Sequence, residues 1–197
     1  MSERQRAPAG AARAELRELG SRFFAFVAPA ATVEAAAAQV EALRRRYPDA
    51  THHCFAWRVG LPAAERAADA GEPAGTAGAP MLAVLRGEGL TNVVAVVVRW
   101  FGGTKLGKGG LVRAYGGALR QALDGLATVE VLARDRLLVA LPYEKLGAVK
   151  RLLQPPAIEL AAERYGAAVE LEVEVAREAR AAFAAALADL ALAAREI

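Results

Sequence analysis

The apolar and polar positions of this chain change their period several times, and each change predicts a new secondary-structure element. In the first two thirds, short apolar runs rich in β-branched and aromatic residues predict strands, and apolar residues at helical spacing predict helices. The expected strands cover 22–27, 51–59 and 93–98, and the expected helices cover 31–46, 81–85 and 111–123. We therefore expect one α+β domain over 15–130, preceded by a flexible tail over 1–14.

The last third of the chain predicts a second domain, over 131–197. Its elements are a strand over 136–141, a helix over 144–154, hairpin strands over 158–165 and 168–175, and a final helix around Phe183. In the second hairpin strand, apolar residues alternate with Glu170, Glu172 and Glu174, so one face is expected in the core and the other in water. The order β-α-β-β-α, with room for a short last strand, is typical of a ferredoxin-like domain. We therefore predict an α+β protein of two domains.

Composition and charge narrow the class of protein. No apolar run is long enough to cross a bilayer, and the start of the chain lacks the apolar segment of a secretory signal, so we expect a cytoplasmic protein. Cys54 is the only cysteine, which excludes an intrachain disulfide. Residues 1–130 carry 16 Lys and Arg against 12 Asp and Glu (+4), and 131–197 carry 9 against 10 (−1), which gives the net charge of +3. The basic first domain is compatible with a nucleic-acid or ribosome partner.

A glycine-rich stretch directly after the valine-rich strand is the strongest candidate for function. No Asp or Glu occurs between Glu88 and Asp124, and the stretch leads into the helix predicted from Leu111. Glycine lets the backbone approach another molecule closely, and the free N–H groups of a helix N-terminus favour an anion. The sequence therefore predicts a nucleic-acid or anion-binding site formed by Arg99, Gly102, Gly103, Thr104, Lys105, Gly107, Lys108, Gly109, Gly110 and Arg113.

The same stretch matches a phosphate-binding P-loop only in part. Gly102, Gly107 and Lys108 fit the pattern G-x-x-x-x-G-K, but Gly109 stands where Ser or Thr would ligate Mg²⁺. A nucleotide hydrolase is therefore not expected. Two interpretations of the glycines stay open: an anion-binding loop, or tight strand-to-helix packing with both lysines in solvent.

The histidines and the cysteine give little support for a metal or a nucleophile. His52 and His53 would point to opposite sides of a strand, and the chain has no other histidine, so we expect no metal and no cofactor. A nucleophilic pair of Cys54 with a histidine stays open, although an inert buried cysteine is the commoner case.

The segment 69–82 holds Asp69, Glu72 and Thr76. Two carboxylates could support general acid–base chemistry, but spacing on a loop fixes no distance between them. A structural role in turn formation is favoured, with Glu72 anchoring a turn or pairing with a cation of the glycine-rich stretch. His53, Asp69, Glu72 and Thr76 are therefore expected as supporting residues of the site, and no catalytic residue is assigned.

Four separated segments occur in the order that one protein family shows. They are Ser21-Arg22-Phe23, Asp49-Ala50-Thr51-His52-His53-Cys54, GEPAGTAGAPML from Gly71, and VVVRWFGGTKLGKGGLVRAYGGAL from Val96. On these segments the chain resembles the IMPACT/YigZ family, and its bacterial YigZ-like members in particular. The resemblance implies an N-terminal domain with the left-handed βαβ fold of ribosomal protein S5 domain 2, and a C-terminal ferredoxin-like domain similar to domain V of elongation factor G.

The resemblance also implies a role in translation. Eukaryotic relatives regulate translation by competing for the activator of an initiation-factor kinase, and nucleic-acid or ribosome binding is implied for bacterial relatives. Three positions depart from the bacterial pattern: Ala70 replaces a second acid, Ala79 a polar or basic residue, and Lys108 a threonine. The missing acid argues against an enzyme that needs a carboxylate pair, whereas Lys108 adds charge to the expected anion site.

We therefore expect a non-enzymatic cytoplasmic protein that binds RNA or the ribosome through Arg99, Lys105, Lys108 and Arg113. One alternative is an enzyme acting on a small anionic or phosphorylated substrate at the same stretch, with Glu72 or His53 nearby. Another is a protein-interaction module that uses the second domain to bind a protein partner. No membrane association is expected, and the sequence predicts no oligomeric state.

Overall fold

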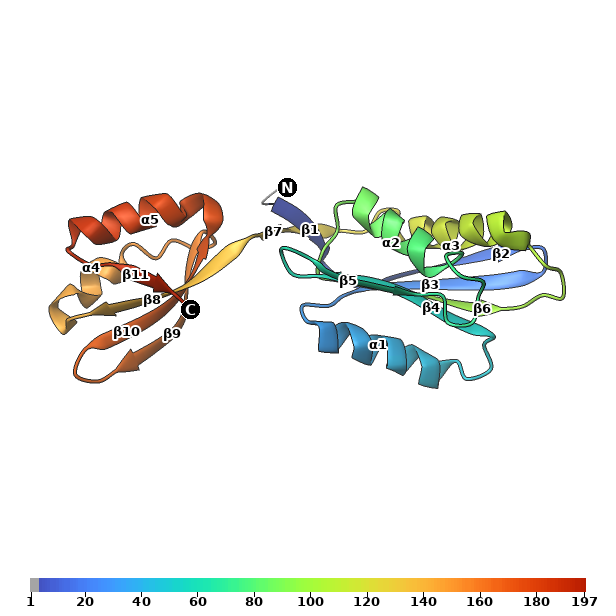
Figure 1. Ribbon diagram of the computed structural model, residues 1–197, viewed down its shortest axis with the longest axis horizontal. Helices are drawn as coiled ribbons and strands as arrows, with labels where there is room; N and C mark the ends of the chain where they lie inside the picture. Colours follow the sequence, from blue (N-terminus) through green and yellow to red (C-terminus); the bar gives the residue numbers. More distant parts are fainter. Residues whose placement is uncertain (1–3) are drawn as a thin grey trace. The chain divides into compact units, whose positions relative to one another are not determined.

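Strand β6 (Val93–Trp100) is the central strand of a five-stranded sheet, and every residue in it except Trp100 is buried (Figure 1). Stiff β-branched side chains suit such a position because they pack well on both faces of a pleated strand. The sheet order is β2-β3-β6-β4-β5, and all neighbouring strands are antiparallel. The strands beside β6 are β3 (Ser21–Pro29) and β4 (His52–Val59), and the edge strands are β2 (Ala12–Glu18) and β5 (Ala64–Ala68). This computed structural model describes residues 4–197.

Helices cover both faces of this sheet, as Figure 1 shows. Helices α2 (Gly78–Gly87) and α3 (Gly107–Leu123) pack on one face, against Val93, Ala95 and Val97 of β6. Helix α1 (Val33–Arg46) packs on the other face, against the residues of β6 that alternate with these. Because β3 and β4 are both antiparallel to β6, they run parallel to each other, and α1 connects them as a βαβ unit.

The structure differs from the flexible tail expected over 1–14. In the part of this segment that is described, β1 (Arg4–Pro8) pairs with β7 (Thr128–Leu132), and β2 begins at Ala12. In β2 the half-buried side chains of Ala14 and Leu16 pack against the core. The exposed side chains of this strand are all charged: Arg13, Glu15, Arg17 and Glu18. Alanine is only weakly apolar, so the alternation of buried and exposed residues in β2 was too weak to predict a strand from the sequence.

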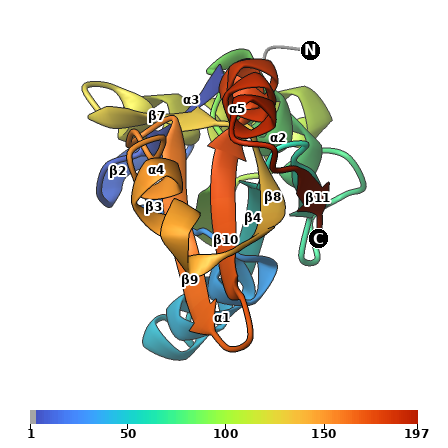
Figure 2. The same cartoon turned by 90° about the vertical axis from the view of Figure 1, so that its left-hand side faces the viewer.

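The second unit, Leu132–Ile197, follows directly after the first, Gln5–Val131. Its elements are β8 (Arg134–Leu141), the 3-10 turn η1 (Tyr143–Lys145), α4 (Leu146–Lys150), β9 (Ile158–Tyr165), β10 (Val169–Ala176), α5 (Arg177–Asp189) and β11 (Ala194–Glu196). The strand order β11-β8-β10-β9 is that of a ferredoxin-like sheet. Figure 2 shows β9 and β10 as neighbouring strands, with α5 above them. The predicted fold class, α+β with two domains, is confirmed.

The acidic residues of β10 lie on the face of this sheet away from the helices. Val169, Leu171, Val173 and Val175 are buried in the core of the unit, as the alternation predicts. Glu172 and Glu174 are only half exposed, because they form ion pairs with Arg164 and Arg136 of the strands beside β10. Within the described residues, no helix is long and apolar enough to span a membrane.

Helix α1 gives a direct test of local stability. The hydroxyl of Thr32 accepts the backbone N–H of Ala35 at 3.1 Å and so caps the helix N-terminus. We expect Thr32→Ala to lower the free energy of unfolding by about 1 kcal/mol, and Thr32→Ser to retain most of it. Both tryptophans, Trp57 and Trp100, lie in the N-terminal unit, so their fluorescence during urea unfolding reports on that unit. Equal stability of Thr32→Ala and the parent would show that the cap contributes nothing.

Candidate functional site

The loop between β5 and α2 is held in shape by the carboxylate of Asp69. Its Oδ1 accepts the backbone N–H groups of Ala77 and Gly78 at 2.9 and 2.8 Å, and its Oδ2 accepts that of Gly75 at 2.8 Å. Helix α2 starts here and its N-cap residue makes no side-chain hydrogen bond, so Asp69 satisfies N–H groups that would otherwise be free. The carboxylate therefore joins the two ends of the loop.

Asp69 and Thr76, both expected as supporting residues, are thus occupied in shaping the loop. The hydroxyl of Thr76 donates to the carbonyl of Pro73 at 2.7 Å. Burial disfavours the charge of Asp69, but its three backbone hydrogen bonds outweigh burial and lower the pKa of Asp69 below its ordinary value. This supports the structural interpretation of the segment.

At the tip of this loop, Glu72 forms a buried ion pair with Arg99 of β6. The Nη1 of Arg99 donates to Oε1 of Glu72 at 2.6 Å, and the hydroxyl of Tyr115 on α3 donates to the same oxygen at 2.7 Å. The side chains of Arg99 and Glu72 are only 5% and 3% exposed. The pair therefore ties the loop to β6 and to α3 at once.

Arg99 makes further contacts, although its buried Nε has no hydrogen-bond partner among the described residues. Its Nη2 donates to the hydroxyl of Ser21 at 3.2 Å. The guanidinium carbon lies 5.2 Å from the ring centre of Phe23 and 5.5 Å from that of Phe101, which are cation–π distances. Arg99 was expected to bind the ligand, and Glu72 to anchor a turn or pair with a cation of the glycine-rich stretch. In the structure Arg99 is that cation, and its side chain forms part of the cavity wall.

The two histidines lie on opposite faces of β4, as the period of a strand requires. His52 lies near Glu72, with its Nε2 3.8 Å from Oε1 of Glu72 and its Nδ1 3.1 Å from the carbonyl oxygen of Ala70. His53 lies on the α1 face beside Tyr47, where burial lowers its pKa. His53 therefore does not reach the glycine-rich stretch, and its place as a supporting residue was wrong.

Cys54 is a core residue. Its thiol donates to the carbonyl of Asp69 at 2.9 Å, and burial raises its pKa to about 12. Because the thiolate is the reactive form, Cys54 is a poor nucleophile at neutral pH. The described residues contain no group of three or more His, Cys, Asp or Glu side chains that could hold a metal ion.

Two glycines of the predicted site are required by packing. A Cβ on Gly102 would lie 1.9 Å from the carbonyl carbon of Gly20, in the turn between β2 and β3, so the two backbones can approach only because both residues are glycine. A Cβ on Gly110 would lie 2.9 Å from the Cβ of Leu106. At these two positions the packing interpretation therefore accounts for the glycine.

The first turn of α3 has no cap. Leu106 precedes the helix and makes no side-chain hydrogen bond to it, and no acidic residue occurs in the first turn. Lys105 and Lys108 are exposed, and neither forms an ion pair within residues 4–197. Free N–H groups and unpaired ammonium groups therefore lie together at the start of α3.

The remaining predicted residues surround this turn. Arg113 is exposed on α3, and its Nη1 lies 3.6 Å from the position that a Cβ on Gly109 would take, so its charge lies near the first turn. Gly103 and Gly107 have positive φ angles, +87° and +70°, which favour glycine. Thr104 is exposed on the loop between them.

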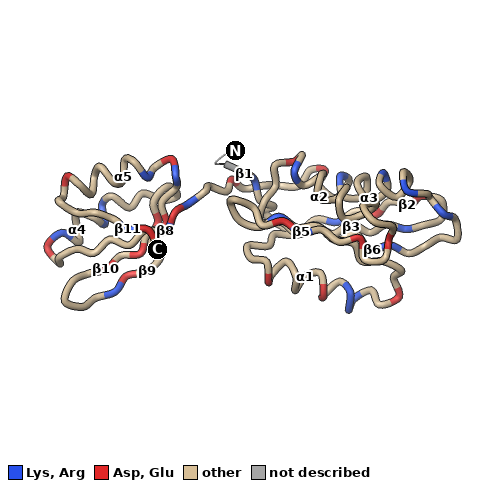
Figure 3. The backbone as a smooth tube through the Cα atoms, in the orientation of Figure 1, with Lys and Arg blue, Asp and Glu red and all other residues tan. Residues whose placement is uncertain are grey.

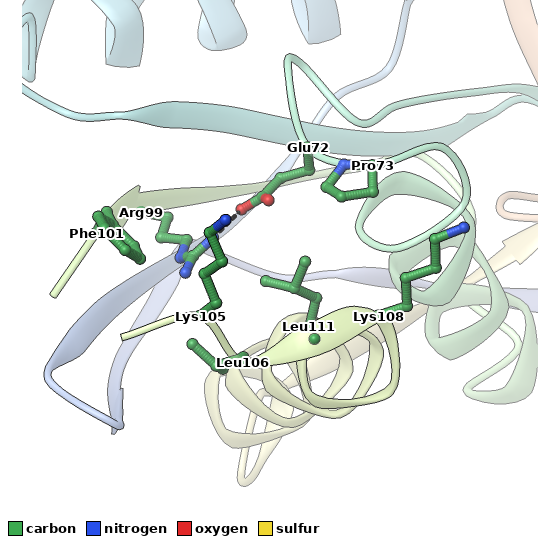
Figure 4. A pocket seen from close by; sticks show the side chains of 9 residues that line it. Glu72, Pro73, Arg99, Phe101, Lys105, Leu106, Lys108 and Leu111 are labelled. Atoms are coloured by element: carbon green, nitrogen blue, oxygen red, sulfur yellow. Dashed lines mark hydrogen bonds and ion pairs between the residues drawn. The ribbon is translucent and has the colours of Figure 1, made fainter. Parts of the chain in front are cut away.

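These elements form a cavity of about 360 Å³ at the start of α3 (Figure 4). Figure 4 shows the Glu72–Arg99 pair as one wall, with Lys105 reaching toward it and Lys108 on the far side of Leu111. The ring of Phe101 also lines the cavity and is 47% exposed. The cavity offers ammonium groups, backbone N–H donors and a flat aromatic surface, which together suit an anionic ligand with a planar group.

Comparison with known proteins shows relatives over most of the chain. A family model described as the Impact N-terminal domain matches residues 19–123, and one described as a domain of unknown function (DUF1949) matches 139–191. The chain is 44% identical to the IMPACT family member YigZ of Escherichia coli over 172 residues, which cover 86% of this chain and 84% of that protein. It is 35% identical to the IMPACT family member YvyE of Bacillus subtilis, over 83% of this chain and 76% of that protein. A crystal structure of a hypothetical protein is 39% identical, covers 100% of this chain and 98% of its own, and has a TM-score of 0.78.

The contact between Gly102 and Gly20 predicts a stability effect. A methyl group on Gly102 would force the turn between β2 and β3 away from the end of β6, so we expect Gly102→Ala to destabilise the N-terminal unit by about 2 kcal/mol, a usual cost of overpacking. Gly87 is a matched control, because a Cβ there meets nothing within 4 Å. Urea unfolding followed by tryptophan fluorescence measures both variants. If Gly102→Ala is as stable as Gly87→Ala, the close contact between the backbones at Gly102 and Gly20 does not require glycine.

The hydrogen bonds of Asp69 predict a pH-dependent stability. Since the folded pKa of Asp69 lies below the ordinary value of 3.8, its ionised form adds stability above that pH, and this stability is lost as pH falls through the folded pKa. We expect Asp69→Asn to be about 2 kcal/mol less stable than the parent at pH 7, because hydrogen bonds to a charged group are lost, and the difference to shrink below pH 3.8. Urea unfolding at pH 7 and at lower pH measures it.

Exposed Asp124 is the control for this series, since Asp124→Asn should change stability by less than about 0.5 kcal/mol at any pH. A difference between Asp69→Asn and the parent that stays constant with pH would mean that ionisation of Asp69 is not the cause.

Proposed function

The chain belongs to the IMPACT family, and from this premise we propose that it is a translation-associated protein that binds RNA, free or in the ribosome, without catalysing a reaction. The observation that carries the proposal is the start of α3, where an uncapped turn and two unpaired lysines lie beside an exposed aromatic ring. Each of these features corresponds to one part of a nucleotide.

Phosphate is the group that the uncapped turn suits. The N–H groups of a helix N-terminus and the helix dipole favour an anion, and Lys105 and Lys108 add two positive charges. Glu72 is the one acidic residue lining the cavity, and Arg99 neutralises it at 2.6 Å. The balance of charge in the cavity is therefore positive, which supports a ligand with phosphate groups.

Phe101 supports a nucleic acid over a simple phosphate. Its ring lies at the same cavity as the lysines, and nearly half of it is exposed. Proteins that bind single-stranded nucleic acid commonly stack bases on such rings, at about 1–3 kcal/mol per base. A single-stranded segment would place a base on Phe101 and its phosphates at Lys105 and Lys108.

The link to translation rests on the family. Regulation of translation is what the resemblance implies for eukaryotic members, and ribosomal RNA is a plentiful source of single-stranded phosphate backbone for a bacterial one. A cytoplasmic location would follow from such a role. The share of both chains covered by the match to the E. coli relative supports a common function for the two.

One observation favours an alternative function, an enzyme acting on a small anionic or phosphorylated substrate. The carboxylate of Glu72 lines the cavity, and its Oε2 accepts no hydrogen bond within residues 4–197. Oε1, in contrast, accepts hydrogen bonds from Arg99 and Tyr115, so this oxygen is already occupied. A positioning role for Glu72 accounts for these contacts without a reaction.

Charge reversal at the two lysines tests the proposed function. We expect Lys105→Glu/Lys108→Glu to bind a fluorescently labelled 12-nucleotide polyuridine RNA about tenfold more weakly or worse, because two phosphate contacts are lost. The slope of log affinity against log salt should fall by about 1.4, at about 0.7 for each contact with a single strand. Fluorescence anisotropy at several salt concentrations measures both quantities, and a denaturing gel of the same samples should show intact RNA.

The matched control is Arg151→Glu/Arg195→Glu, which makes the same change of net charge at two exposed residues of the second unit. This variant should bind RNA nearly as well as the parent. If both double variants bind alike, the start of α3 is not the RNA site. Shortened RNA on the gel would contradict binding without catalysis.

A further inference from the structure

A second groove lies on the opposite face of the same sheet, between α1 and the strands β2 and β3. Helix α1 lies on this face of the sheet (Figure 1) and packs mainly on β4 and β6, whereas β2 and β3 lie on the other side of β6 from β4. The space, here called the α1 groove, has a volume of about 460 Å³. Among the residues that the structure describes, its wall includes Arg13, Phe26, Ala28, Gln39, Leu43 and Arg46, and no acidic residue.

Half-buried aromatic rings continue the α1 groove along the sheet. Phe24 and Phe26 meet edge to face with ring centres 4.7 Å apart, Phe26 lies 5.7 Å from Tyr47, and Tyr47 lies 5.6 Å from Trp100. The row of rings ends at Trp100, and the next residue, Phe101, lines the cavity at the start of α3. A path of aromatic side chains therefore leads from the α1 groove to the end of β6.

The positive charges of the α1 groove are exposed and unpaired. Arg13 lies on β2 directly opposite Phe26 of β3, and Arg46 lies in the basic last turn of α1, which Figure 3 shows in blue. Neither arginine forms an ion pair within the described chain. The guanidinium of Arg46 is 5.6 Å from the ring centre of Tyr47, so charge and ring surface occur together.

Two acidic residues near this face form ion pairs, and a third accepts a hydrogen bond from a neutral donor. Glu15 and Glu41 each pair with an arginine beside them, at 2.8 and 2.6 Å. The carboxylate of Asp49 accepts the indole N–H of Trp100 at 2.8 Å. The α1 groove therefore combines apolar walls with two arginines that no ion pair within the described residues neutralises, and this is complementary to an anionic partner.

We infer that the α1 groove binds bases of a single-stranded nucleic acid, with Phe24 and Phe26 as stacking surfaces and Arg13 and Arg46 as contacts to the flanking phosphates. An acidic peptide added to the free edge of β2 would use the same charges. It would engage the backbone of an outer strand, however, and would leave the row of rings without a role. Stacking on bases uses rings and arginines together. This site is separate from the start of α3, so it goes beyond the proposed function.

Two measurements on the full chain test the inference. Arg13→Glu/Arg46→Glu should weaken binding of the 12-nucleotide polyuridine RNA at least fivefold and lower the salt slope by about 1.4. Arg151→Glu/Arg195→Glu is again the control of equal charge. In the parent protein, ultraviolet crosslinking with 4-thiouridine RNA should label the tryptic peptide 23–44, which contains both phenylalanines, and the same crosslink should persist in Lys105→Glu/Lys108→Glu.

The outcomes separate the two sites. Parent-like affinity of Arg13→Glu/Arg46→Glu, together with no crosslink in 23–44, overturns the α1 groove and leaves the start of α3 standing. Weak binding by this variant with full binding by Lys105→Glu/Lys108→Glu supports the groove and overturns the proposed site at α3. If the variant does not fold, the parent protein alone gives the answer: a crosslink in 23–44 supports the α1 groove, and its absence overturns it. A third outcome would assign the groove to a peptide instead. In that case the RNA gives no crosslink in 23–44, and a polyglutamate peptide binds the parent tightly but does not bind Arg13→Glu/Arg46→Glu.

Discussion

The buried ion pair of Arg99 and Glu72 is the contact on which the candidate site depends. Removing two charges from water costs several kcal/mol each, and such a pair is tolerated only when the remaining hydrogen-bonding groups are largely satisfied. Tyr115, Ser21 and two aromatic rings supply most of these contacts. The pair thereby joins β3, β6, α3 and the loop after β5, and it fixes the wall against which a ligand would rest.

This constraint separates the charges that hold the site from those that can bind. Arg99 and Glu72 neutralise each other, so the positive charge of the cavity comes from Lys105, Lys108 and the N–H groups of α3. The carboxylate of Asp69 is likewise occupied, because it accepts the backbone N–H groups at the start of α2. An arginine buried in this way would contribute little to the salt dependence of RNA binding, whereas exposed lysines contribute fully.

The sequence predicted the fold well where side chains contrast strongly, as in the valines of β6 and the Val-Glu alternation of β10. It missed β1 and β2 because alanine and arginine leave only a faint period. The glycine-rich stretch stays a predicted site, and the structure shows a cavity at it. Pairing of Glu72 with a cation of the glycine-rich stretch was one expectation, and the structure shows that this cation is Arg99. The burial of the pair could not be read from the sequence, because Glu72 lies 27 residues away on a loop whose path Asp69 determines. The face of His53 could have been inferred from the strand period, since its neighbours Cys54 and His52 lie toward the glycine-rich stretch.

We propose that the start of α3 receives a phosphate while the Glu72–Arg99 pair only shapes the wall. Backbone amide NMR shifts of the full chain, recorded during titration with a short polyuridine RNA, distinguish these roles. We expect large, saturable shifts at Lys105 through Gly110 and at Phe101, with the fold otherwise unchanged. Saturable binding that leaves the amides of 105–110 unmoved would contradict it.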